Sequence, residues 1–301
     1  MSEYSKLKVS LIGAGKMGTF HARKIALHPM VRFMGVFDQN QEAAAALASQ
    51  FPRCQTFSSL EELLNNSEAV LLVAATAAHF DLANQIIAKG IPLLVEKPLA
   101  ATSEQANKLV EAAEAKNLVL AVGHIERYNP AFTVLTEYLH KQLLLKLEFR
   151  RCSPYPDRMQ NDSVVFDMMI HDLDLALSLS HGSAVVKVEA TGKKTKSKLY
   201  DIVKAKVVFE NGLVTEFEAN RDNPDRIRTI EALCEDNVFQ VDLIAKTLTP
   251  NISDIPIKTL DQIETEQRNF VAAVRNKRHM IVSGRDAAKA ISLAEQIEAA
   301  I

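Results

Sequence analysis

Residues 7–18 read Leu-Lys-Val-Ser-Leu-Ile-Gly-Ala-Gly-Lys-Met-Gly, an apolar run followed at once by the glycine pattern G-x-G-x-x-G. The apolar run predicts a buried strand, and the residues after Gly15 predict a helix. In such a strand–turn–helix unit, the first glycine permits a tight turn and the second lets a pyrophosphate approach the backbone. The third allows the helix to pack closely on the strand. The stretch therefore predicts the first unit of a dinucleotide-binding fold, with phosphates at the helix N-terminus.

A carboxylate follows the second apolar run, 31–37. Asp38 lies 20 residues after Gly18 (38 − 18 = 20), where a carboxylate accepts hydrogen bonds from the ribose 2′-hydroxyl of NAD. It would repel the 2′-phosphate of NADP, and its neighbours Gln39 and Asn40 offer no cation to hold one. We therefore expect NAD rather than NADP as the cofactor. The alternative is a glycine turn and a solvated aspartate at this spacing by coincidence.

The first 125 residues alternate between apolar runs and helix-like stretches. Runs of valine, isoleucine and leucine without polar alternation indicate strands that are covered on both faces. Their repetition with short links predicts right-handed crossovers and a doubly wound parallel sheet, which is an α/β fold. We expect strands at 7–12, 31–37, 69–74, 91–95 and 118–122, and helices at 16–28, 41–50, 60–65, 78–89 and 103–116.

The pattern changes in the second half of the chain, where longer segments alternate apolar and polar residues. Asn211-Gly212 between two of these segments is a strong hairpin signal. We predict an α+β domain that is built on a mostly antiparallel sheet. Its strands are expected at 143–150, 184–191, 202–209, 213–219, 227–233 and 238–243, and its helices at 164–180, 261–275 and 285–300.

Composition narrows the functional class. The 301 residues include 35 Lys and Arg against 37 Asp and Glu, a net charge of −2, which gives no support for binding to nucleic acid or to a membrane surface. Globular domains usually hold about 100–200 residues, so two domains are expected. The cysteines Cys54, Cys152 and Cys234 form neither a metal-ligand spacing nor a disulfide framework. We therefore expect no metal and a cytoplasmic location.

Polar or small residues follow the carboxyl ends of several predicted strands. Because those ends share one edge of a doubly wound sheet, ligands bind there. Pro98 disfavours helical backbone at Lys97, which is therefore held extended, either solvated in a loop or aimed into the crevice. The residues at this edge are Gly13–Gly18, Asp38, Ala75, Thr76, Glu96, Lys97, Pro98, Gly123 and His124.

A second polar cluster lies in the predicted helix 164–180. At helical spacing, Asp167, His171 and Asp174 share one face. A carboxylate beside an imidazole fixes its tautomer and raises its basicity, which suits a general base near neutral pH. A helix start that is rich in acids and carries a surface histidine fits this segment equally well. Metal binding is the weaker third option, because no further ligand set stands at a suitable spacing.

Together these motifs resemble the glucose–fructose oxidoreductase / inositol dehydrogenase / MocA (Gfo/Idh/MocA) family. The resemblance rests on Gly13–Gly18, Val95-Glu96-Lys97-Pro98-Leu99-Ala100, residues 123–130 and Asp167-x-x-x-His171, and it extends to the closing segment 270–300. It implies an NAD-binding Rossmann domain over 1–123 and a substrate-binding and oligomerisation domain over 124–301. The open sheet of the second domain would form a homodimer or homotetramer. The Lys97–Pro98 peptide would be cis.

The resemblance also implies an NAD-dependent dehydrogenase that acts on CH–OH groups, with Lys97 and His171 catalytic and Asp167 beside them. His171 would remove the hydroxyl proton while hydride departs, and Lys97 would hydrogen-bond the same oxygen and stabilise alkoxide character. The cofactor would contact Gly13, Gly15, Lys16, Met17, Gly18, Asp38, Ala75, Thr76, His79, Glu96 and Lys97.

Departures from the family pattern concern the substrate. Thr76 is not followed by the usual proline, Ser163-Val164-Val165 replaces a glycine-rich lead-in, and Met169 replaces a glycine. Residues 123–127 and 167–172 resemble one branch, the bacterial UDP-N-acetylglucosamine 3-dehydrogenases that supply an amino sugar for lipid A. The resemblance thus implies a sugar or nucleotide-sugar substrate, with oxidation at C3 of UDP-N-acetylglucosamine as the leading expectation.

A nucleotide sugar would need arginines to hold its diphosphate bidentately. Among Arg127, Arg150, Arg151 and Arg158, most are expected to be solvated or paired, and we choose Arg127 and Arg158. Tyr155 would contact a sugar or base ring or lie in the core. With Lys97, Asp167 and His171 they form the expected substrate-binding set.

Two other functions stay open. One is a dehydrogenase or reductase of another carbonyl or cyclitol, and the other is a non-catalytic NAD-binding regulatory protein. The presence of both Lys97 and His171 argues against the regulatory protein, which needs no proton relay.

Overall fold

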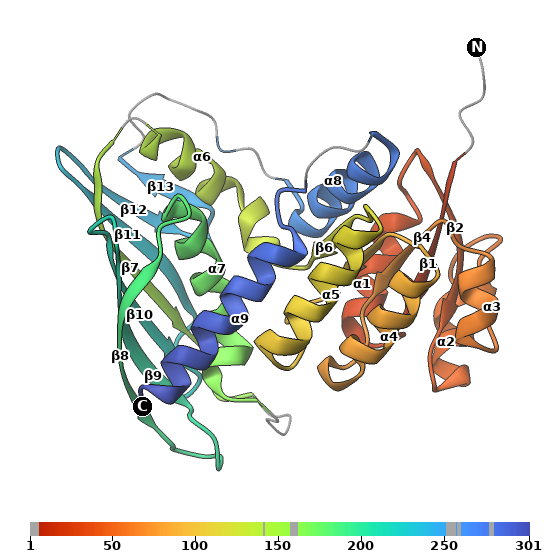
Figure 1. Ribbon diagram of the computed structural model, residues 1–301, viewed down its shortest axis with the longest axis horizontal. Helices are drawn as coiled ribbons and strands as arrows, with labels where there is room; N and C mark the ends of the chain where they lie inside the picture. Colours follow the sequence, from red (N-terminus) through yellow and green to blue (C-terminus); the bar gives the residue numbers. More distant parts are fainter. Residues whose placement is uncertain (1–5, 141, 157–161, 251–256, 258–259, 277–279) are drawn as a thin grey trace. The chain divides into compact units, whose positions relative to one another are not determined.

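The computed structural model describes residues 6–140, 142–156, 162–250, 257, 260–276 and 280–301. The chain folds into two compact units, Met1–Ile125 with Asp261–Ala288 and Glu126–Leu260 with Lys289–Ile301 (Figure 1). This division differs from the predicted boundary at 123/124 because the segment 261–288 returns to the first unit. Its Phe270 and Val271 are buried in the hydrophobic core that β1 and β2 also form, a long-range contact that no local pattern reveals.

The first unit contains a six-stranded sheet, sheet A, in the order β3-β2-β1-β4-β5-β6. All its strand pairs are parallel, which confirms the predicted doubly wound fold. The strands are β1 Leu7–Ile12, β2 Val31–Phe37, β3 Gln55–Thr56, β4 Ala69–Leu72, β5 Leu93–Val95 and β6 Leu120–Val122. β3 was not expected from the sequence, because it has only two residues, both exposed.

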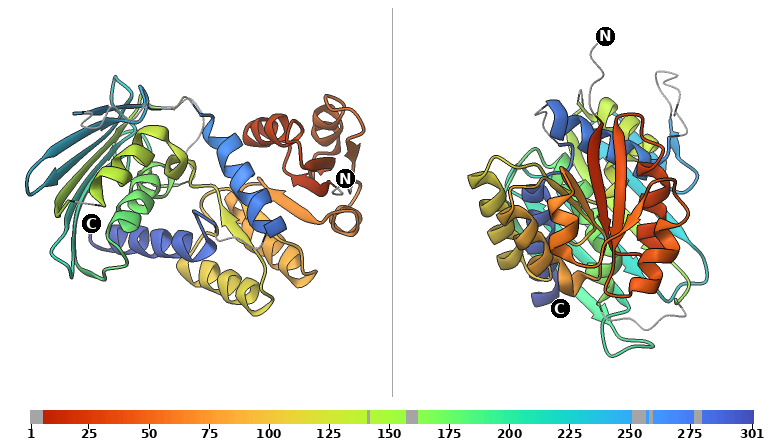
Figure 2. Two further views of the ribbon diagram at one scale, coloured as in Figure 1. Left: turned by 90° about the horizontal axis from the view of Figure 1, so that it is seen from above. Right: turned by 90° about the vertical axis from the view of Figure 1, so that its right-hand side faces the viewer.

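Helices lie on both faces of sheet A, as the two views in Figure 2 show. α4 packs beside α5, and α1 packs beside α8. The helices of this unit are α1 Lys16–Ile25, α2 Gln41–Ala48, α3 Leu60–Asn65, α4 Thr76–Ala88, α5 Ser103–Ala115 and α8 Gln262–Asn276. Because both faces are covered, the central strands are mostly apolar, and all four residues of β4 are buried.

The second unit contains a seven-stranded sheet, sheet B, in the order β13-β12-β11-β7-β10-β9-β8. Only the β7–β10 pair is parallel among its strand pairs, so the prediction of a mostly antiparallel sheet is confirmed. Asn211-Gly212 joins β9 to β10 in the expected hairpin, and Gly212 adopts φ +87°. The strands are β7 Leu144–Cys152, β8 Val185–Lys193, β9 Ile202–Phe209, β10 Val214–Asn220, β11 Ile227–Cys234, β12 Val238–Asp242 and β13 Thr247–Thr249.

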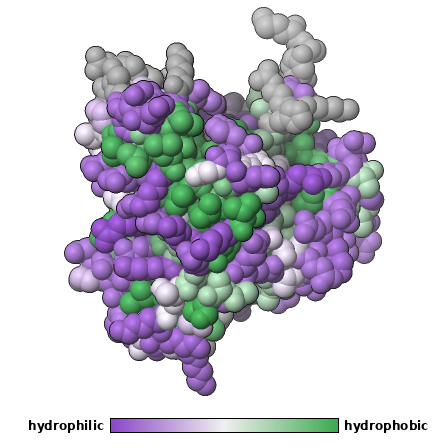
Figure 3. All heavy atoms as spheres, turned by 60° about the vertical axis from the view of Figure 1, so that its left-hand side comes forward, coloured by the Kyte–Doolittle hydropathy of each residue, from purple (hydrophilic) through white to green (hydrophobic). Residues whose placement is uncertain are grey.

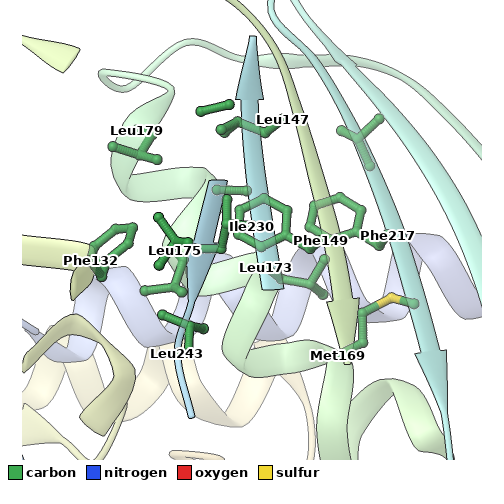
Figure 4. Close-up of a cluster of buried hydrophobic side chains, with 14 of the residues drawn as sticks. Phe132, Leu147, Phe149, Met169, Leu173, Leu175, Leu179, Phe217, Ile230 and Leu243 are labelled. Atoms are coloured by element: carbon green, nitrogen blue, oxygen red, sulfur yellow. The ribbon is translucent and has the colours of Figure 1, made fainter. Parts of the chain in front are cut away.

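One face of sheet B carries the core of this unit (Figure 4). Phe149 of β7 and Phe217 of β10 stack there with ring centroids 5.2 Å apart, and Leu173 of α7 is part of the same buried cluster. The unit includes a 3₁₀-helix at Ile125–Tyr128, α6 Pro130–Leu139, a π-helix at Val165–Met169, α7 Ile170–Leu179 and most of α9 Gly284–Ala299.

α6 was not expected from the sequence, although its start signal was present. The Asn129 side chain accepts a hydrogen bond from the Ala131 N–H at 3.1 Å, and Pro130 occupies the first turn. Both residue types favour a helix start. Among the described helices, none is long and apolar enough to cross a membrane.

Candidate active site

The glycine loop between β1 and α1 has the geometry that the sequence predicts. Gly13 adopts φ +105°, and a Cβ there would lie 2.4 Å from the Val73 carbonyl oxygen, so no other residue fits. A Cβ on Gly18 would lie 2.1 Å from the Gly13 carbonyl oxygen, whereas one on Gly15 would meet nothing within 4 Å. Gly15 is thus the point where a ligand can approach the backbone. The described residues provide no side-chain cap at the N-terminus of α1, which suits a phosphate.

Asp38 lies beside this loop. Its Oδ2 accepts a hydrogen bond from the Ala14 N–H at 2.7 Å, and its Oδ1 accepts one from the Asn40 N–H at 2.8 Å. These two bonds fix the carboxylate at the carboxyl end of β2. Each oxygen keeps a second acceptor site, so the carboxylate can also accept the two hydroxyls of a ribose. The residues present therefore fit an NAD adenosine and its pyrophosphate.

The Glu96-Lys97-Pro98 segment follows β5, and its Lys97–Pro98 peptide is cis. The Glu96 carboxylate accepts hydrogen bonds from the Lys97 N–H at 3.0 Å and from the imidazole of His21 at 2.8 Å. Gly123, at the end of β6, leaves room for it, because a Cβ there would lie 3.0 Å from Glu96 Oε2. The segment that carries Lys97 is thereby tied to the sheet edge.

His79 of α4 holds the same segment from another side. Its Nδ1 lies 2.7 Å from the Pro98 carbonyl oxygen, and its Nε2 lies 3.0 Å from the Ala74 carbonyl oxygen. The side chain is buried, at 1% exposure. His79 therefore links the loop after β4, which leads into Ala75 and Thr76, to the loop that carries Lys97.

Three buried polar residues near Glu96 were not singled out from the sequence. His21 of α1 and Glu266 of α8 are fully buried, and Gln267 of α8 is 1% exposed. The Gln267 amide donates to the His21 carbonyl oxygen at 3.1 Å. The sequence held one signal for them, since each is a polar residue on the apolar face of a helix. Their contact was not predictable, because only the fold brings α1 and α8 together.

Glu266 receives no hydrogen bond from the part of the chain that the structure describes. Burial, with the nearby Glu96 carboxylate, raises its pKa well above the ordinary value of 4.5. A raised folded-state pKa means that stability is fully present below the unfolded pKa and is lost as the pH rises above it, by about 1.4 kcal/mol per pH unit until the folded-state pKa is reached.

Glu266→Gln keeps the shape of the side chain and removes the free-energy cost of ionising a buried carboxyl. We expect the variant to have a higher free energy of unfolding than the original chain at about pH 8, with the difference disappearing near pH 4. Urea denaturation across this range measures it. Glu264→Gln on the same helix, where the carboxylate is exposed and paired with Arg268, is the matched control. A gain that is equal at both pH values would contradict the assignment.

The second predicted site segment begins in a π-helix rather than in the expected regular α-helix. Val165–Met169 forms the π turn, and α7 starts at Ile170. A π turn inserts extra residues into the helical repeat, and such turns occur often at functional sites. Asp167 and His171 are both partly exposed, so a ligand could reach them.

Arg221 connects Asp167 to a buried carboxylate. Its side chain is 1% exposed, its Nε donates to Asp201 at 2.9 Å, and its Nη1 lies 4.0 Å from Asp167 Oδ2. Burial raises the pKa of Asp201, but hydrogen bonds from the backbone of Lys196, Thr195 and Ser197 and from Arg221 together hold it well below its usual value.

Tyr155, a predicted substrate residue, belongs to the same neighbourhood. Its hydroxyl lies 3.5 Å from Asp201 Oδ1, and its ring is half-buried. The structure thus brings Tyr155, Asp201, Arg221 and Asp167 together within the second unit. No local sequence pattern points to Arg221 or Asp201. Arg221 directly follows strand β10, and Asp201 follows a lysine-rich loop that precedes β9.

The arginines near the unit boundary have unequal surroundings. Arg127 forms a bidentate pair with Asp174, with Nε–Oδ2 at 2.7 Å and Nη2–Oδ1 at 3.1 Å. Arg151 is buried between Asp172 and Glu126, whereas Arg150 is half-exposed and pairs with Glu218. Arg158 lies outside the described residues.

Comparison with known proteins agrees with this geometry. Residues 7–124 match the model of the Gfo/Idh/MocA oxidoreductase family, NAD-binding Rossmann fold, and residues 142–240 match a C-terminal domain model of that family. The chain belongs to the Gfo/Idh/MocA family, as the sequence motifs indicated. It is an NAD-dependent dehydrogenase that acts on CH–OH groups.

Two relatives illustrate the range within the family. UDP-N-acetylglucosamine 3-dehydrogenase from Acidithiobacillus ferrooxidans is 31% identical over 98% of this chain and 97% of that protein. Its solved structure superposes with a TM-score of 0.93 and covers 98% of both chains. Inositol 2-dehydrogenase from Cereibacter sphaeroides is 33% identical, but the match covers 56% of this chain and 52% of that protein.

Proposed function

We propose that this protein oxidises the C3 hydroxyl of UDP-N-acetylglucosamine with NAD, and that the product serves the synthesis of an amino sugar for lipid A. The observation that carries the proposal is the likeness to a UDP-N-acetylglucosamine 3-dehydrogenase along 98% of the chain. The match to an inositol 2-dehydrogenase covers 56%. A likeness that runs along nearly the whole of both proteins includes the second unit, so it weighs more than one that covers about half of each.

In this proposal Lys97, His171 and Asp167 perform the chemistry. The His171 imidazole accepts the proton of the substrate hydroxyl, and the Lys97 ammonium donates a hydrogen bond to the same oxygen and stabilises its developing negative charge. Asp167 orients the imidazole. When bound, NAD supplies the hydride acceptor.

The cofactor residues of the proposal are those of the sheet edge. Gly13, Gly15, Lys16, Met17 and Gly18 would hold the pyrophosphate, Asp38 the adenosine ribose, and Ala75, Thr76, Glu96 and Lys97 the nicotinamide half. His79 would act indirectly, because its two ring nitrogens already lie against the Ala74 and Pro98 carbonyl oxygens.

Tyr155, Arg127 and Arg158 complete the proposed substrate site. The ring of Tyr155 is half-buried and its hydroxyl lies 3.5 Å from Asp201 Oδ1, which supports a contact with the sugar or base. The Nε and Nη2 groups of Arg127 already donate hydrogen bonds to Asp174, so any phosphate contact would use its Nη1 group. The diphosphate role therefore rests mainly on Arg158.

A panel of alcohols with NAD tests the substrate. We expect nicotinamide absorbance to appear with UDP-N-acetylglucosamine and not with N-acetylglucosamine, glucose or myo-inositol. N-acetylglucosamine is the matched control, because it carries the same C3 hydroxyl without the nucleotide. Reduction by myo-inositol alone would replace the proposed substrate with a cyclitol. Binding of NAD without its reduction by any alcohol in the panel would overturn the proposed substrate.

Cofactor choice has its own test. We expect NAD to bind at least about tenfold more tightly than NADP in titration calorimetry, because the fixed Asp38 carboxylate repels a 2′-phosphate. Asp38→Asn should narrow this ratio, whereas Asp225→Asn, an exposed change in the second unit, should leave it unaltered. Equal or tighter binding of NADP by the original chain would overturn the assignment of Asp38.

We propose that sheet B forms a homodimer or homotetramer. Its outer face carries apolar side chains with unusually high exposure, Leu145 at 42%, Leu233 at 39% and Val238 at 44%, beside charged rows such as Lys146, Glu148 and Glu216. Hydrophobic patches among hydrophilic side chains are visible in Figure 3. Light scattering should give a dimer or tetramer mass, and a single species of monomer mass would contradict the proposal.

We also propose a cytoplasmic location. Cys54, Cys152 and Cys234 are all free thiols, and burial raises the pKa of Cys54 to about 12, so this thiol is unreactive. Free thiols are usual in a reducing compartment.

A further inference from the structure

Four residues from three distant parts of the chain form one line of hydrogen bonds inside the first unit. Gln267 of α8 contacts His21 of α1, His21 contacts Glu96 at the end of β5, and Glu96 contacts the backbone of Lys97. The distances are 3.1 Å from Gln267 Nε2 to His21 Nδ1, 2.8 Å from His21 Nε2 to Glu96 Oε1 and 3.0 Å from the Lys97 nitrogen to Glu96 Oε2.

The direction of these bonds follows from one backbone group. The Gln267 amide nitrogen also lies 3.1 Å from the His21 carbonyl oxygen, which can only accept. The amide NH₂ must therefore point toward His21, since the opposite amide orientation would set two oxygens against each other. One of its N–H bonds goes to the carbonyl oxygen and the other to Nδ1. His21 Nδ1 is thus an acceptor and carries no proton.

The rest of the line is then determined. An imidazole without a proton on Nδ1 carries it on Nε2, so Nε2–H donates to Glu96 Oε1. Glu96 is an acceptor at both oxygens, because Oε2 receives the Lys97 N–H. Burial raises the pKa of Glu96, but the bonds from His21 and Lys97 outweigh it and hold the pKa below the ordinary value. These bonds favour the ionised form of Glu96, whereas burial and the Glu96 charge raise the pKa of Glu266.

We infer that His21 and Gln267 are positioning residues for Lys97: they fix the Glu96 carboxylate, which in turn fixes the backbone from which the Lys97 side chain extends. The inference rests on the proposed catalytic role of Lys97. A lysine ammonium stands on four rotatable bonds, so its direction depends on a rigid Cα. His79 completes the support, because it holds the next carbonyl, that of Pro98, at 2.7 Å.

Gln267→Glu is the sharpest perturbation. A protonated carboxyl at this position has a single donor, so it would lose at least the bond to the His21 carbonyl oxygen or the bond to Nδ1. An ionised carboxylate has nearly the shape of the amide but cannot donate, so contact with Nδ1 would require a proton on that nitrogen. His21 would then either lose its Nε2 proton, and with it the bond to Glu96, or become doubly protonated. The matched control is Gln262→Glu, which makes the same change on the same helix at a side chain that donates to the Ile125 carbonyl oxygen instead.

Two magnetic resonance measurements test the inference on the full chain, independent of any activity. In ¹⁵N-histidine spectra, the His21 signals, identified by their loss in His21→Gln, should show the Nε2–H tautomer. The Lys97 amide proton should exchange faster with solvent in Gln267→Glu than in the original chain or in Gln262→Glu. An Nδ1–H tautomer in the original chain, or unchanged Lys97 exchange in Gln267→Glu, would overturn the inference.

Kinetics then separates positioning from folding. Displacement of a catalytic group by about 1 Å can cost up to about 10²-fold, so kcat should fall by about ten- to a hundredfold in Gln267→Glu while KM for the alcohol changes little. If Gln267→Glu loses only thermal stability and keeps the kcat of Gln262→Glu, His21 and Gln267 stabilise the fold and do not position Lys97. If no alcohol is oxidised, the proposed function fails, while the tautomer and exchange results still decide the hydrogen-bond line.

Discussion

Replacement of His171 by alanine should lower kcat by about 10²–10⁴-fold, the contribution that a general base typically makes. The affinity for NAD should not change, because the proposed cofactor residues all lie in the first unit. Stopped-flow absorbance of the reduced nicotinamide measures kcat, and titration calorimetry measures the affinity. The expectation depends only on the imidazole, which sits on α7 directly after the π turn.

His140→Ala provides the matched control, since His140 is an exposed histidine of the same unit at the end of α6. It should turn over at the rate of the original chain. A His171→Ala variant that keeps that rate would remove His171 from the mechanism. A lower kcat with both substitutions would indicate that each disturbs the fold of the second unit.

Replacement of Arg151 by methionine should lower the free energy of unfolding by about 3–5 kcal/mol, the usual cost of removing one partner from a buried ion pair. Arg151 Nη2 lies 2.7 Å from Asp172 Oδ1, Nη1 lies 3.0 Å from Glu126 Oε1, and the side chain is 3% exposed. Burial works against its charge, but the two carboxylates outweigh this and raise its pKa. Without the guanidinium, the buried Asp172 carboxylate loses its hydrogen bonds from Arg151. Glu126 loses one of its two arginine partners and keeps Arg228 at 3.3 Å.

Arg150→Met is the neighbouring control. Arg150 is on the same strand, but its side chain is 53% exposed and pairs with Glu218 at 3.0 Å, so its loss should cost less than about 1 kcal/mol. Chemical denaturation monitored by circular dichroism compares the two. Equal costs for both variants would mean that the pair at Arg151 contributes no more than a surface contact.

The parts of the site that depend on local chemistry were predictable from the sequence. The expected roles of Gly13, Gly15 and Gly18 follow from a strand, a turn and a helix that are adjacent in the chain. The structure shows close approaches at Gly13 and Gly18 and open space at Gly15. The place of Asp38 at the end of the second strand was predictable because the strand–helix–strand unit has a nearly constant length. The parallel, doubly wound character of sheet A and the mostly antiparallel sheet B also follow from apolar periodicity and turn signals, whereas the strand order was not predicted.

The parts that depend on distant partners were not predictable. Gln267 and His21 are separated by 246 positions, and neither belongs to a local motif. The return of 261–288 to the first unit is missed for the same reason, because a helix pattern does not state which sheet the helix covers. The π turn departs from the regular α-helical repeat, and no residue type in Val165–Met169 predicts it. Asp201 and Arg221 meet only through the fold of sheet B.

Because the chain leaves the first unit at Ile125 and re-enters it at Asp261, no cut at a single peptide yields two independent folding fragments. A truncated protein ending at Ile125 would lack α8, and the apolar surface that Phe270 and Val271 cover would meet water. A designer who wants the dinucleotide-binding unit alone must splice the two segments with a linker. One who wants to exchange the second unit must replace both 126–260 and 289–301, because Leu293, Ala294 and Ile297 of α9 belong to the core of that unit.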